Sequence, residues 1–302
     1  MVLTVVTATH NCIKAGNRER LIRCVESIAR LKTEHEHLIY DGASTDGTVE
    51  LLRELEAKMT GLKVVSEPDA GIYNALNKGV RDAKGKWFYV LGADDYIVRP
   101  EVLDSIINGA GNGTQVIITP VVLETMEGEM SSMKFTKMRQ LGAFFNGSVC
   151  CHQGELMWTT LVRELGADVR QVGFDERYRI SADMDMFLRA HLKAVSIQYI
   201  FRYFACFHEG GCSTSNADIY KKEAFSCVVR AMKLNQKNAE YFSKKKYFPP
   251  HIALRLIFHR DVAVRIAAMS MLVRRIVDIS PSIFRPIITA IKGMCDKKLD
   301  TI

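Results

Sequence analysis

The sequence predicts an α/β protein in which a mostly parallel sheet is flanked by helices, with a helical extension at the C-terminal end. Over the first hundred residues, short apolar runs alternate with stretches whose apolar residues recur at helical spacing. Beyond Tyr241 the chain becomes basic, and helical patterns dominate. The alternation also indicates where a ligand would bind, because such sheets carry their sites at the carboxyl ends of the strands.

The expected elements follow one another regularly along the chain. Four strands and three intervening helices are expected first, with the strands at 3–8, 37–40, 62–65 and 87–92 and the helices at 21–31, 49–59 and 72–83. The apolar run 115–123 should extend the sheet, and 132–138 is a candidate strand in an otherwise loop-like segment. A helix should begin near Ala182, and a strand pair should lie around 195–207.

The positive charge of the chain is concentrated in its C-terminal tail. The formal net charge is +7, and residues 241–302 hold twelve Lys or Arg against four Asp and no Glu. No nucleic-acid-binding motif accompanies this charge, so a nucleic-acid partner is disfavoured. The tail is also rich in apolar residues, which favours binding to an anionic membrane surface. Packing against the rest of the chain, or against a second subunit in a homo-oligomer, is the alternative.

Neither end of the chain predicts a spanning or secreted segment. The first residues lack a basic region and a cleavage site, so they are expected to form a strand and not a signal peptide. The tail has no uncharged stretch of 18 residues. The eight cysteines show no CxxC pair. The expected location is the cytoplasm, with peripheral attachment to the cytoplasmic face of the inner membrane as a further expectation.

Three polar loops follow the expected strands and should gather at one edge of the sheet. The first is DGASTDGT, in which Asp41 ends a strand and can accept a hydrogen bond from a nucleobase. Its alternative role is structural, because Ser44, Thr45 or Asp46 would cap the helix that begins near Thr48.

The second loop, EPDAG, places Asp69 in a turn before a helix. Asn74 and Lys78 lie on one face of that helix by their i,i+4 spacing, and this polar row can face an anionic ligand. A capped surface helix is the alternative.

The third loop, YVLGADD, places Asp94 beside Asp95. Two adjacent carboxylates repel each other unless a cation or a donor lies between them. Mg²⁺ and Mn²⁺ take oxygen ligands and bridge to phosphates, so the pair suits a diphosphate site. A turn or a helix cap would need no ligand.

The ordered series of motifs resembles the family 2 glycosyltransferases with the GT-A fold, particularly bacterial enzymes that build colanic acid, O-antigen and other cell-surface polysaccharides. The resemblance covers roughly residues 3–213 and runs through TVVTATHN, DGASTDGT, SEPDAGIYNALNKG, FYVLGADD, CHQG, SADMDMFLR and FHEGGCS. It implies a GT-A catalytic domain at 1–215, with the basic helical region at 216–302.

The resemblance implies binding roles for the strand-end residues. Thr7, Thr9 and Asp41 match the nucleobase and ribose contacts, and Asp69 matches a further nucleotide contact. Lys78 joins this donor-binding set. The sequence departs from the commoner DDGS pattern at 42–43, so any role of a second aspartate is lost there.

The same resemblance implies the catalytic groups. Asp94 would contact the ribose or the donor sugar, and Asp95 would hold Mn²⁺ or Mg²⁺. Asp183 aligns with the residue that serves as base, and Asp185 is the alternative. Residues two apart on a helix point about 200° apart, so one of these carboxylates can face the site while the other pairs with Arg189 at i+4.

His152 and His208 are expected to contact the acceptor or the departing diphosphate, with a structural hydrogen bond as the alternative for each. The reaction implied is an inverting transfer from a nucleotide-sugar donor, with a UDP-sugar favoured, to a hydroxyl of a saccharide or lipid-linked saccharide. The competing functions are a non-catalytic sugar-nucleotide-binding scaffold at the membrane and a sugar-1-phosphate nucleotidylyltransferase. The latter's Gly-rich basic loop after the first strand is missing.

Overall fold

The computed structural model describes residues 1–133, 151–166, 172–193, 195–211, 216–231, 233 and 235–245, with six single positions between 252 and 272. The first half of the described chain contains β1 (Leu3–Thr9), α1 (Arg18–Ala29), β2 (His35–Asp41), α2 (Thr48–Lys58), β3 (Leu62–Ser66), α3 (Ile72–Asp82), β4 (Trp87–Val90), β5 (Tyr96–Ile97), α4 (Pro100–Asn108), β6 (Val116–Ile118), β7 (Val121–Glu124) and β8 (Met130–Met133). The second half contains η1 (His152–Gly154), β9 (Glu155–Trp158), α7 (Thr159–Glu164), α8 (Ala182–Leu192), β10 (Ile197–Tyr199), β11 (Ala205–His208), α10 (Ala217–Ala231) and α11 (Gln236–Lys245).

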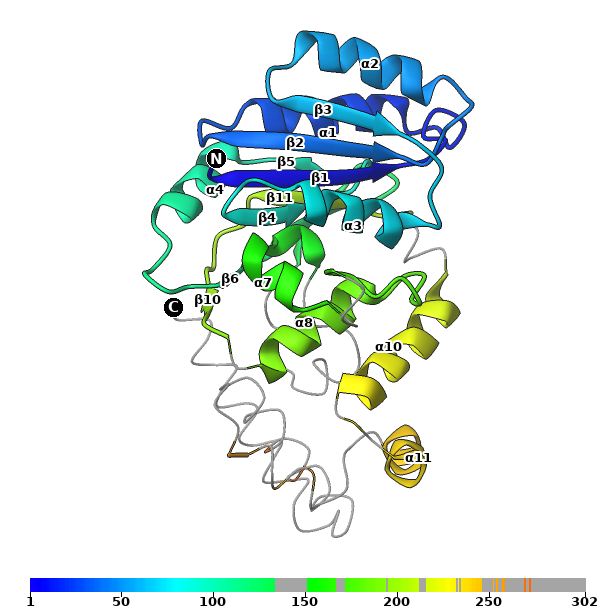
Figure 1. The fold of residues 1–302 in the computed structure, drawn as a ribbon, viewed down its shortest axis with the longest axis vertical. Helices are drawn as coiled ribbons and strands as arrows, with labels where there is room; N and C mark the ends of the chain where they lie inside the picture. Colours follow the sequence, from blue (N-terminus) through cyan, green and yellow to red (C-terminus); the bar gives the residue numbers. More distant parts are fainter. Residues whose placement is uncertain are drawn as a thin grey trace.

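A mostly parallel sheet with the strand order β10-β6-β9-β4-β1-β2-β3 forms the centre of the molecule (Figure 1). β1 to β4 are parallel in this sheet, as the alternating sequence pattern predicts. A second sheet has the order β5-β11-β7-β8. The predicted α/β class with helices flanking a mostly parallel sheet is therefore confirmed.

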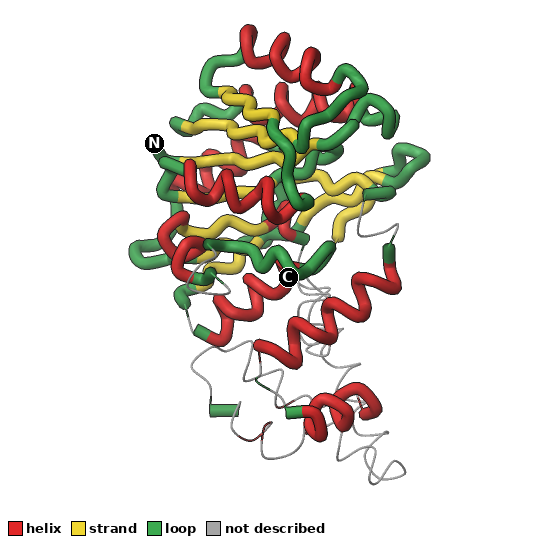
Figure 2. Tube along the Cα trace, turned by 45° about the vertical axis from the view of Figure 1, so that its right-hand side comes forward, coloured by secondary structure: helices red, strands yellow, loops and turns green. Residues whose placement is uncertain are grey.

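Helices cover both faces of the central sheet (Figures 1 and 2). Side chains alternate across β1: Leu3 and Val5 pack in a core with α1 and α4, whereas Val6 packs in a core with α3 and α8. This alternation follows from the two-residue period of a strand. It places apolar residues of the first strand on both faces of the sheet, which helices bury on both sides.

Two predictions of strands are confirmed in part. In the run 115–123, β6 extends the central sheet as predicted, whereas β7 joins the second sheet, because the chain turns at Thr119 and Pro120 and Pro120 has no N–H for a ladder. The strands around 195–207 are β10 and β11, which also belong to separate sheets. β8 covers the start of the candidate strand 132–138, whose remainder lies outside the described residues.

Several elements were not expected, and α4 and β9 are two of them. α4 begins with Pro100 and places Leu103, Ile106 and Ile107 on its buried side, a spacing that is readable in the sequence. β9 inserts antiparallel between β4 and β6. Its position depends on pairing with strands more than thirty residues away, which no local pattern encodes.

The boundary at residue 215 stays a prediction, since most of the region 216–302 lies outside the described residues. α10 begins two residues later and lies beside α8, where Ala224, Cys227 and Val228 join the same core as α3 and α8. Figure 2 shows the two helices together next to the sheet. Most of the basic tail beyond residue 245 lies outside the described residues. In the part of the chain that is described, no helix is long and apolar enough to cross a membrane.

Candidate active site

The loops at the carboxyl ends of β1 and β2 are fastened to each other. The backbone N–H of Asn11 donates to the Ser44 hydroxyl at 2.7 Å, and the Asn11 side chain accepts from the Thr45 N–H at 3.0 Å. Asn11 and Ala43 have positive φ angles of 48° and 58°. Non-glycine residues keep such angles only where their surroundings hold them, so this rim of the sheet is shaped before any ligand arrives.

Asp41 is the centre of this rim. Its side chain is 1% exposed. It accepts hydrogen bonds from the hydroxyls of Thr9 and Ser66 and from both the N–H and the hydroxyl of Ser44. Four donors fill the four acceptor positions of a carboxylate. Asp41 therefore joins the ends of β1, β2 and β3, and Asp46 is the residue that bonds the Thr48 N–H at the start of α2.

Thr7 and Thr9 are buried as well. The Thr7 hydroxyl donates to the Leu91 carbonyl at 2.9 Å and lies 3.0 Å from Nε2 of His37. Burial lowers the pKa of His37 to about 3, so this histidine is neutral. In this structure the side chains of Thr7, Thr9 and Asp41 are enclosed and bonded within the protein, and their contact with the nucleotide stays a prediction.

Asp69 lies against the first rim from the loop after β3. A Cβ atom on Gly42 would be 2.8 Å from Oδ2 of Asp69, so the glycine at the departure from DDGS makes room for this carboxylate. Asp69 also accepts from the Gly71 N–H at 2.8 Å. It stays partly exposed at the edge of the sheet, where a nucleotide contact was expected.

The polar row on α3 is used within the chain. Lys78 pairs with Glu67 at 2.8 Å and donates to the Pro68 carbonyl at 3.2 Å. Asn74 donates to Glu176, in the loop before α8. These contacts fasten the EPDAG loop and the loop at 172–181 to α3. An anionic ligand would have to compete with Glu67 for Lys78.

Asp95 is 1% exposed, and both of its carboxylate oxygens accept hydrogen bonds. Oδ2 accepts from the Gln153 amide at 2.6 Å, and Oδ1 accepts from the His208 backbone N–H at 2.9 Å. Burial, followed by the neighbouring Asp94, raises the pKa of Asp95 to about 7. Protein donors occupy both oxygens of Asp95, and its role as the metal ligand stays a prediction.

Asp94 is the half-exposed member of the pair. No described residue donates a hydrogen bond to its carboxylate. A Cβ atom on Gly211 would lie 3.5 Å from Oδ2 of Asp94, so the glycine pair after β11 passes close beside it. Asp94 thus has an oxygen available to a ligand.

Asp183 projects from the first turn of α8, and its side chain is 29% exposed. Oδ2 lies 3.3 Å from Nδ1 of His152, and Oδ1 lies 3.3 Å from the Tyr73 hydroxyl, which donates to the Ile180 carbonyl. Burial alone would lower the pKa of His152, but Asp183, Asp95 and Asp94 together raise it above its ordinary value. His152 is therefore the point at which the two carboxylate motifs meet.

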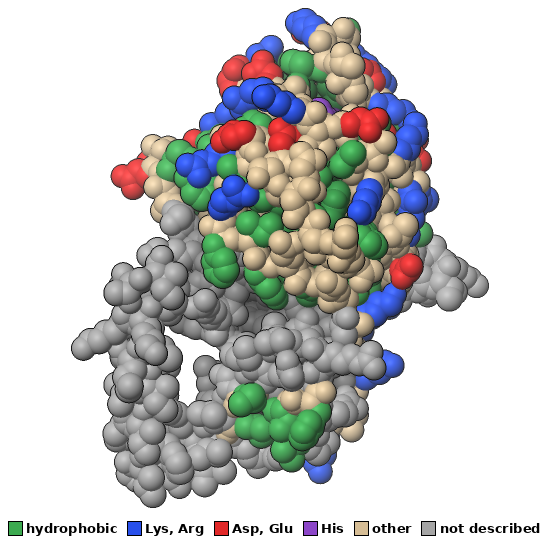
Figure 3. All heavy atoms as spheres, turned by 90° about the vertical axis from the view of Figure 1, so that its left-hand side faces the viewer, with side chains coloured by type: hydrophobic (Ala, Val, Ile, Leu, Met, Phe, Trp, Pro, Cys, Tyr) green, Lys and Arg blue, Asp and Glu red, His purple; other side chains and the backbone are tan. Residues whose placement is uncertain are grey.

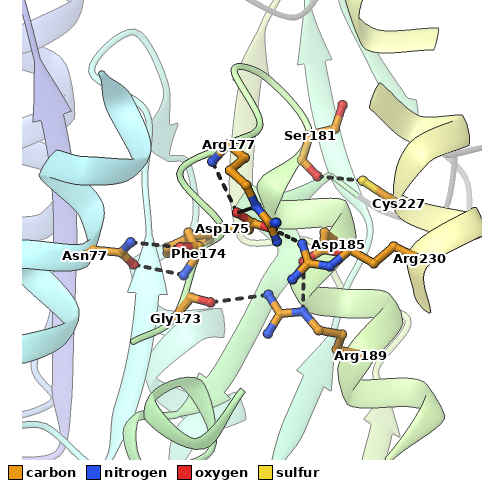
Figure 4. Close-up of polar contacts among 10 residues, drawn as sticks. All are labelled: Asn77, Gly173, Phe174, Asp175, Arg177, Ser181, Asp185, Arg189, Cys227 and Arg230. Carbon is orange, nitrogen blue, oxygen red and sulfur yellow. Dashed lines mark hydrogen bonds and ion pairs between the residues drawn. The ribbon is translucent and has the colours of Figure 1, made fainter. Parts of the chain in front are cut away.

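Asp185 is buried on the opposite side of α8 (Figure 4). Its carboxylate pairs with Arg189 at 2.8 Å, the i+4 partner that the helical spacing predicted. Nearby, Asp175 is also buried and pairs with Arg177 and with Arg230 from α10 (Figure 4). Asp185 is thus placed for a structural ion pair, and Asp183 is the carboxylate that reaches the site.

Three groups that position the site were not among the predicted residues. Gln153 follows His152 in CHQG and holds Asp95. Tyr73 supports Asp183 from α3. Glu223, on α10, accepts from the backbone N–H groups of residues 179, 180 and 181 at 2.7 to 3.0 Å. The motif CHQG could have indicated Gln153, whereas nothing in the sequence marks Tyr73 or Glu223.

Within the described residues, no group of three or more His, Cys, Asp or Glu side chains could hold a metal ion. A divalent cation here would take one carboxylate from the protein and its remaining ligands from elsewhere. Magnesium bound through one or two carboxylates and substrate phosphates has this pattern, so Asp94 fits a metal that arrives with a diphosphate.

The fold and the site define an α/β transferase with a strand-end nucleotide site. The family model described as glycosyl transferase family 2 matches residues 4–166, more than half of the chain. The chain belongs to glycosyl transferase family 2 and is a glycosyltransferase. This result decides against the nucleotidylyltransferase and scaffold alternatives.

Relatives and solved structures agree with this result. A PGL/p-HBAD biosynthesis glycosyltransferase of Mycobacterium bovis is 28% identical over 207 residues, which span 65% of this chain and 74% of the relative. The putative glycosyltransferase EpsH of Bacillus subtilis is 22% identical over 260 residues, 82% of this chain and 74% of EpsH.

Two solved structures show the same fold. TarS 1-349 of S. aureus, in complex with UDP-GlcNAc, superposes with a TM-score of 0.60 at 17% identity and covers 89% of each chain. The mannosyltransferase PcManGT of Pyrobaculum calidifontis, in complex with GDP-Man and Mn²⁺, has a TM-score of 0.56 at 15% identity, covering 97% of this chain and 79% of the other. The fold is therefore GT-A.

Proposed function

We propose that the protein transfers a sugar, with inversion, from a nucleotide-diphosphate donor to a hydroxyl of a saccharide or lipid-linked saccharide in cell-surface polysaccharide synthesis. The observation that carries this proposal is the contact of Asp183 with His152, whose neighbour Gln153 holds Asp95 beside Asp94. A half-exposed carboxylate at a strand end and a second one on α8 supply the two charges that such a transfer needs. The relatives from Mycobacterium bovis and Bacillus subtilis support the assignment.

Asp183 is the proposed base. As the acceptor oxygen attacks the anomeric carbon, the carboxylate accepts the hydroxyl proton and the bond to the nucleoside diphosphate breaks. A single displacement of this kind inverts the configuration at the anomeric carbon. Tyr73 and His152 fix both oxygens of Asp183, and this limits the directions from which the acceptor can be approached.

Asp94 is the proposed protein ligand of Mn²⁺ or Mg²⁺. When bound, the cation would neutralise charge that develops on the leaving diphosphate. Asp95 supports its neighbour Asp94, because hydrogen bonds from Gln153 and His208 to Asp95 fix the strand end. His152 lies close enough to feel the charge of Asp94, so a protonated His152 can also stabilise the departing diphosphate.

A donor-hydrolysis screen tests the proposed function. UDP-, GDP- and dTDP-sugars would be incubated with the full chain, with and without Mn²⁺ or Mg²⁺, and the release of free nucleotide followed. Cation-dependent hydrolysis of one donor class, with a UDP-sugar expected, supports the proposal. Failure to bind or hydrolyse any of these donors with either cation contradicts it.

The basic tail is proposed to hold the enzyme at the cytoplasmic face of a membrane, near a lipid-linked acceptor. The charge surplus begins only at residue 241, and on the face drawn in Figure 3 basic and acidic side chains are interspersed over the described part of the molecule. Removing residues 241–302 should weaken binding to vesicles that contain anionic lipid, and added salt should weaken binding of the full chain. Equal vesicle binding by both chains would refute this role.

A further inference from the structure

A cavity of about 550 Å³ lies beside the active site, between α1 and the turn that joins β7 to β8. Arg20, Arg23 and Glu26 line it from α1, Glu124 and Met126 line it from the turn, and His208 lines it from β11. The volume lies within the range of ligand-binding pockets. None of these residues, apart from His208, belongs to the site described above.

His208 is a buried histidine that lines this cavity, and it is 3% exposed. Nδ1 of its ring lies 3.5 Å from Oε2 of Glu124, which is its partner. Nε2 has no partner among the described residues. Buried polar groups are nearly always satisfied, so Nε2 is a position at which a ligand can supply the missing partner.

Glu124 and Arg23 form a rigid polar wall next to this ring. The guanidinium of Arg23 makes two hydrogen bonds with the carboxylate of Glu124, at 2.7 and 3.3 Å, and lies 3.9 Å from the centre of the Tyr96 ring. These contacts fix the side chains before binding. Preorganised donors and acceptors lower the entropic cost of holding a ligand.

The chemistry of the lining favours a neutral ligand. Arg20 and Arg23 are accompanied by Glu19, Glu26 and Glu124, so an isolated phosphate would meet three carboxylates. Fixed carboxylates, guanidinium groups and an imidazole suit a ligand that both donates and accepts many hydrogen bonds. The apolar surfaces of Ile22 and Met126 suit its C–H faces.

We infer that this cavity binds a neutral saccharide unit of the acceptor or product chain, outside the reacting position. The wall is shared with the active site, because His208 lines the cavity and its backbone N–H holds Asp95, and Gly211 passes beside Asp94. The assignment of the ligand as acceptor rests on the proposed function. The cavity would add affinity for chains long enough to reach it.

Two pairs of surface residues offer matched controls for a test. Met126 is 60% exposed and lines the cavity, whereas Met130 is 53% exposed and does not. Arg20 lines the cavity, whereas Arg18, two residues earlier on the same helix, does not. The exposed methionines are replaceable without loss of the fold. Met126→Ala and Met130→Ala therefore compare the same substitution inside and outside the cavity lining.

The experiment measures binding of neutral gluco-, galacto-, manno- and rhamno-oligosaccharides of two to six units to the full chain, by saturation-transfer difference NMR and titration. Met126→Ala and Arg20→Ala are expected to weaken binding about tenfold, while Met130→Ala and Arg18→Ala leave it unchanged. Competition between product oligosaccharide and acceptor for this binding would show that the ligand of the cavity is a unit of the acceptor or product chain. Binding that none of these variants alters, or no binding by any member of the panel, overturns the inference.

A parallel measurement separates this inference from the proposed function. Donor hydrolysis should be unchanged in Met126→Ala and Arg20→Ala, because neither residue belongs to the donor site. If Met126→Ala and Arg20→Ala weaken saccharide binding but the protein hydrolyses no donor, the assignment of the cavity stands and the proposed transfer reaction is contradicted. Competition by inorganic phosphate at the cavity would instead show an anion site and overturn the neutral-saccharide assignment.

Discussion

The carboxylate of Asp183 lies 3.3 Å from Nδ1 of His152, and this pair joins the helix that carries the proposed base to the segment that holds the Asp94-Asp95 motif. His152 is followed directly by Gln153, which bonds Asp95. The two carboxylate motifs are 88 residues apart in the sequence, yet they are connected through two adjacent side chains.

Replacing Asp183 with Asn should remove transfer and preserve donor binding. The amide cannot accept the acceptor proton, and general-base contributions are about 10²- to 10⁴-fold. Transfer rates and donor affinity should be measured on the same preparation. Transfer at the wild-type rate would refute the assignment of the base.

Asp185→Asn provides the contrast on the same helix. Breaking a buried ion pair leaves Arg189 without its partner and costs about 3–5 kcal/mol. Thermal or urea unfolding should show a marked loss of stability in Asp185→Asn and a small change in Asp183→Asn. Equal losses in the two variants would contradict the separation of a structural and a chemical carboxylate.

Substitutions at Asp94 and Asp95 should have different effects: the first should change donor binding, and the second should lower the stability of the fold. Asp94→Asn should lose the cation dependence of donor binding and keep its melting temperature. Asp95→Ala leaves the Gln153 amide and the His208 N–H unpaired, each at a cost of about 1–3 kcal/mol, so it should unfold at lower temperature. Titration of donor with and without Mn²⁺, together with calorimetry, checks both. A wild-type cation response in Asp94→Asn would disprove its role as ligand.

The pKa of His152 should lie above its ordinary value in the free enzyme and fall in Asp183→Asn. Burial lowers this pKa, and Asp183 is the largest of the groups that raise it. The ion pair therefore stabilises the fold at pH values below the unfolded pKa, about 6.5, and this contribution is lost as pH rises through the higher folded pKa. NMR titration of the ring protons in the wild-type protein and in Asp183→Asn measures the shift. An unchanged pKa in Asp183→Asn would contradict the contact.

Glu223 should act on the reaction through the loop that precedes α8. Its carboxylate accepts three backbone N–H groups at residues 179–181. In Glu223→Gln one oxygen becomes an NH₂ donor that faces these groups, so about 1–3 kcal/mol of stability should be lost. Transfer should fall more than donor binding, because the loop leads directly to Asp183. A matched loss of both would assign Glu223 to general stability alone.

Periodicity and loop chemistry predicted much of the fold. The first four strands and three helices lie within a few residues of their expected bounds, and their loops meet at one edge, because parallel strands bring their carboxyl ends together. In the run 115–123, β6 extends the central sheet as predicted, but the place of β7 was not predicted, because the apolar character of the run is the same whether its halves share one sheet or join two. Only the partners of β6 and β7 decide that.

The sequence by itself determined that the chain has strand-end loops rich in Asp and a second carboxylate motif on a helix, since residue type and spacing are local properties. It also predicted that one of Asp183 and Asp185 would pair with Arg189, which follows from helical geometry. Tertiary structure alone decided which carboxylates remain accessible. Asp41 and Asp95 are closed off by donors from strands and loops distant in sequence, whereas Asp94 and Asp183 stay partly exposed, because burial depends on packing that no local pattern records.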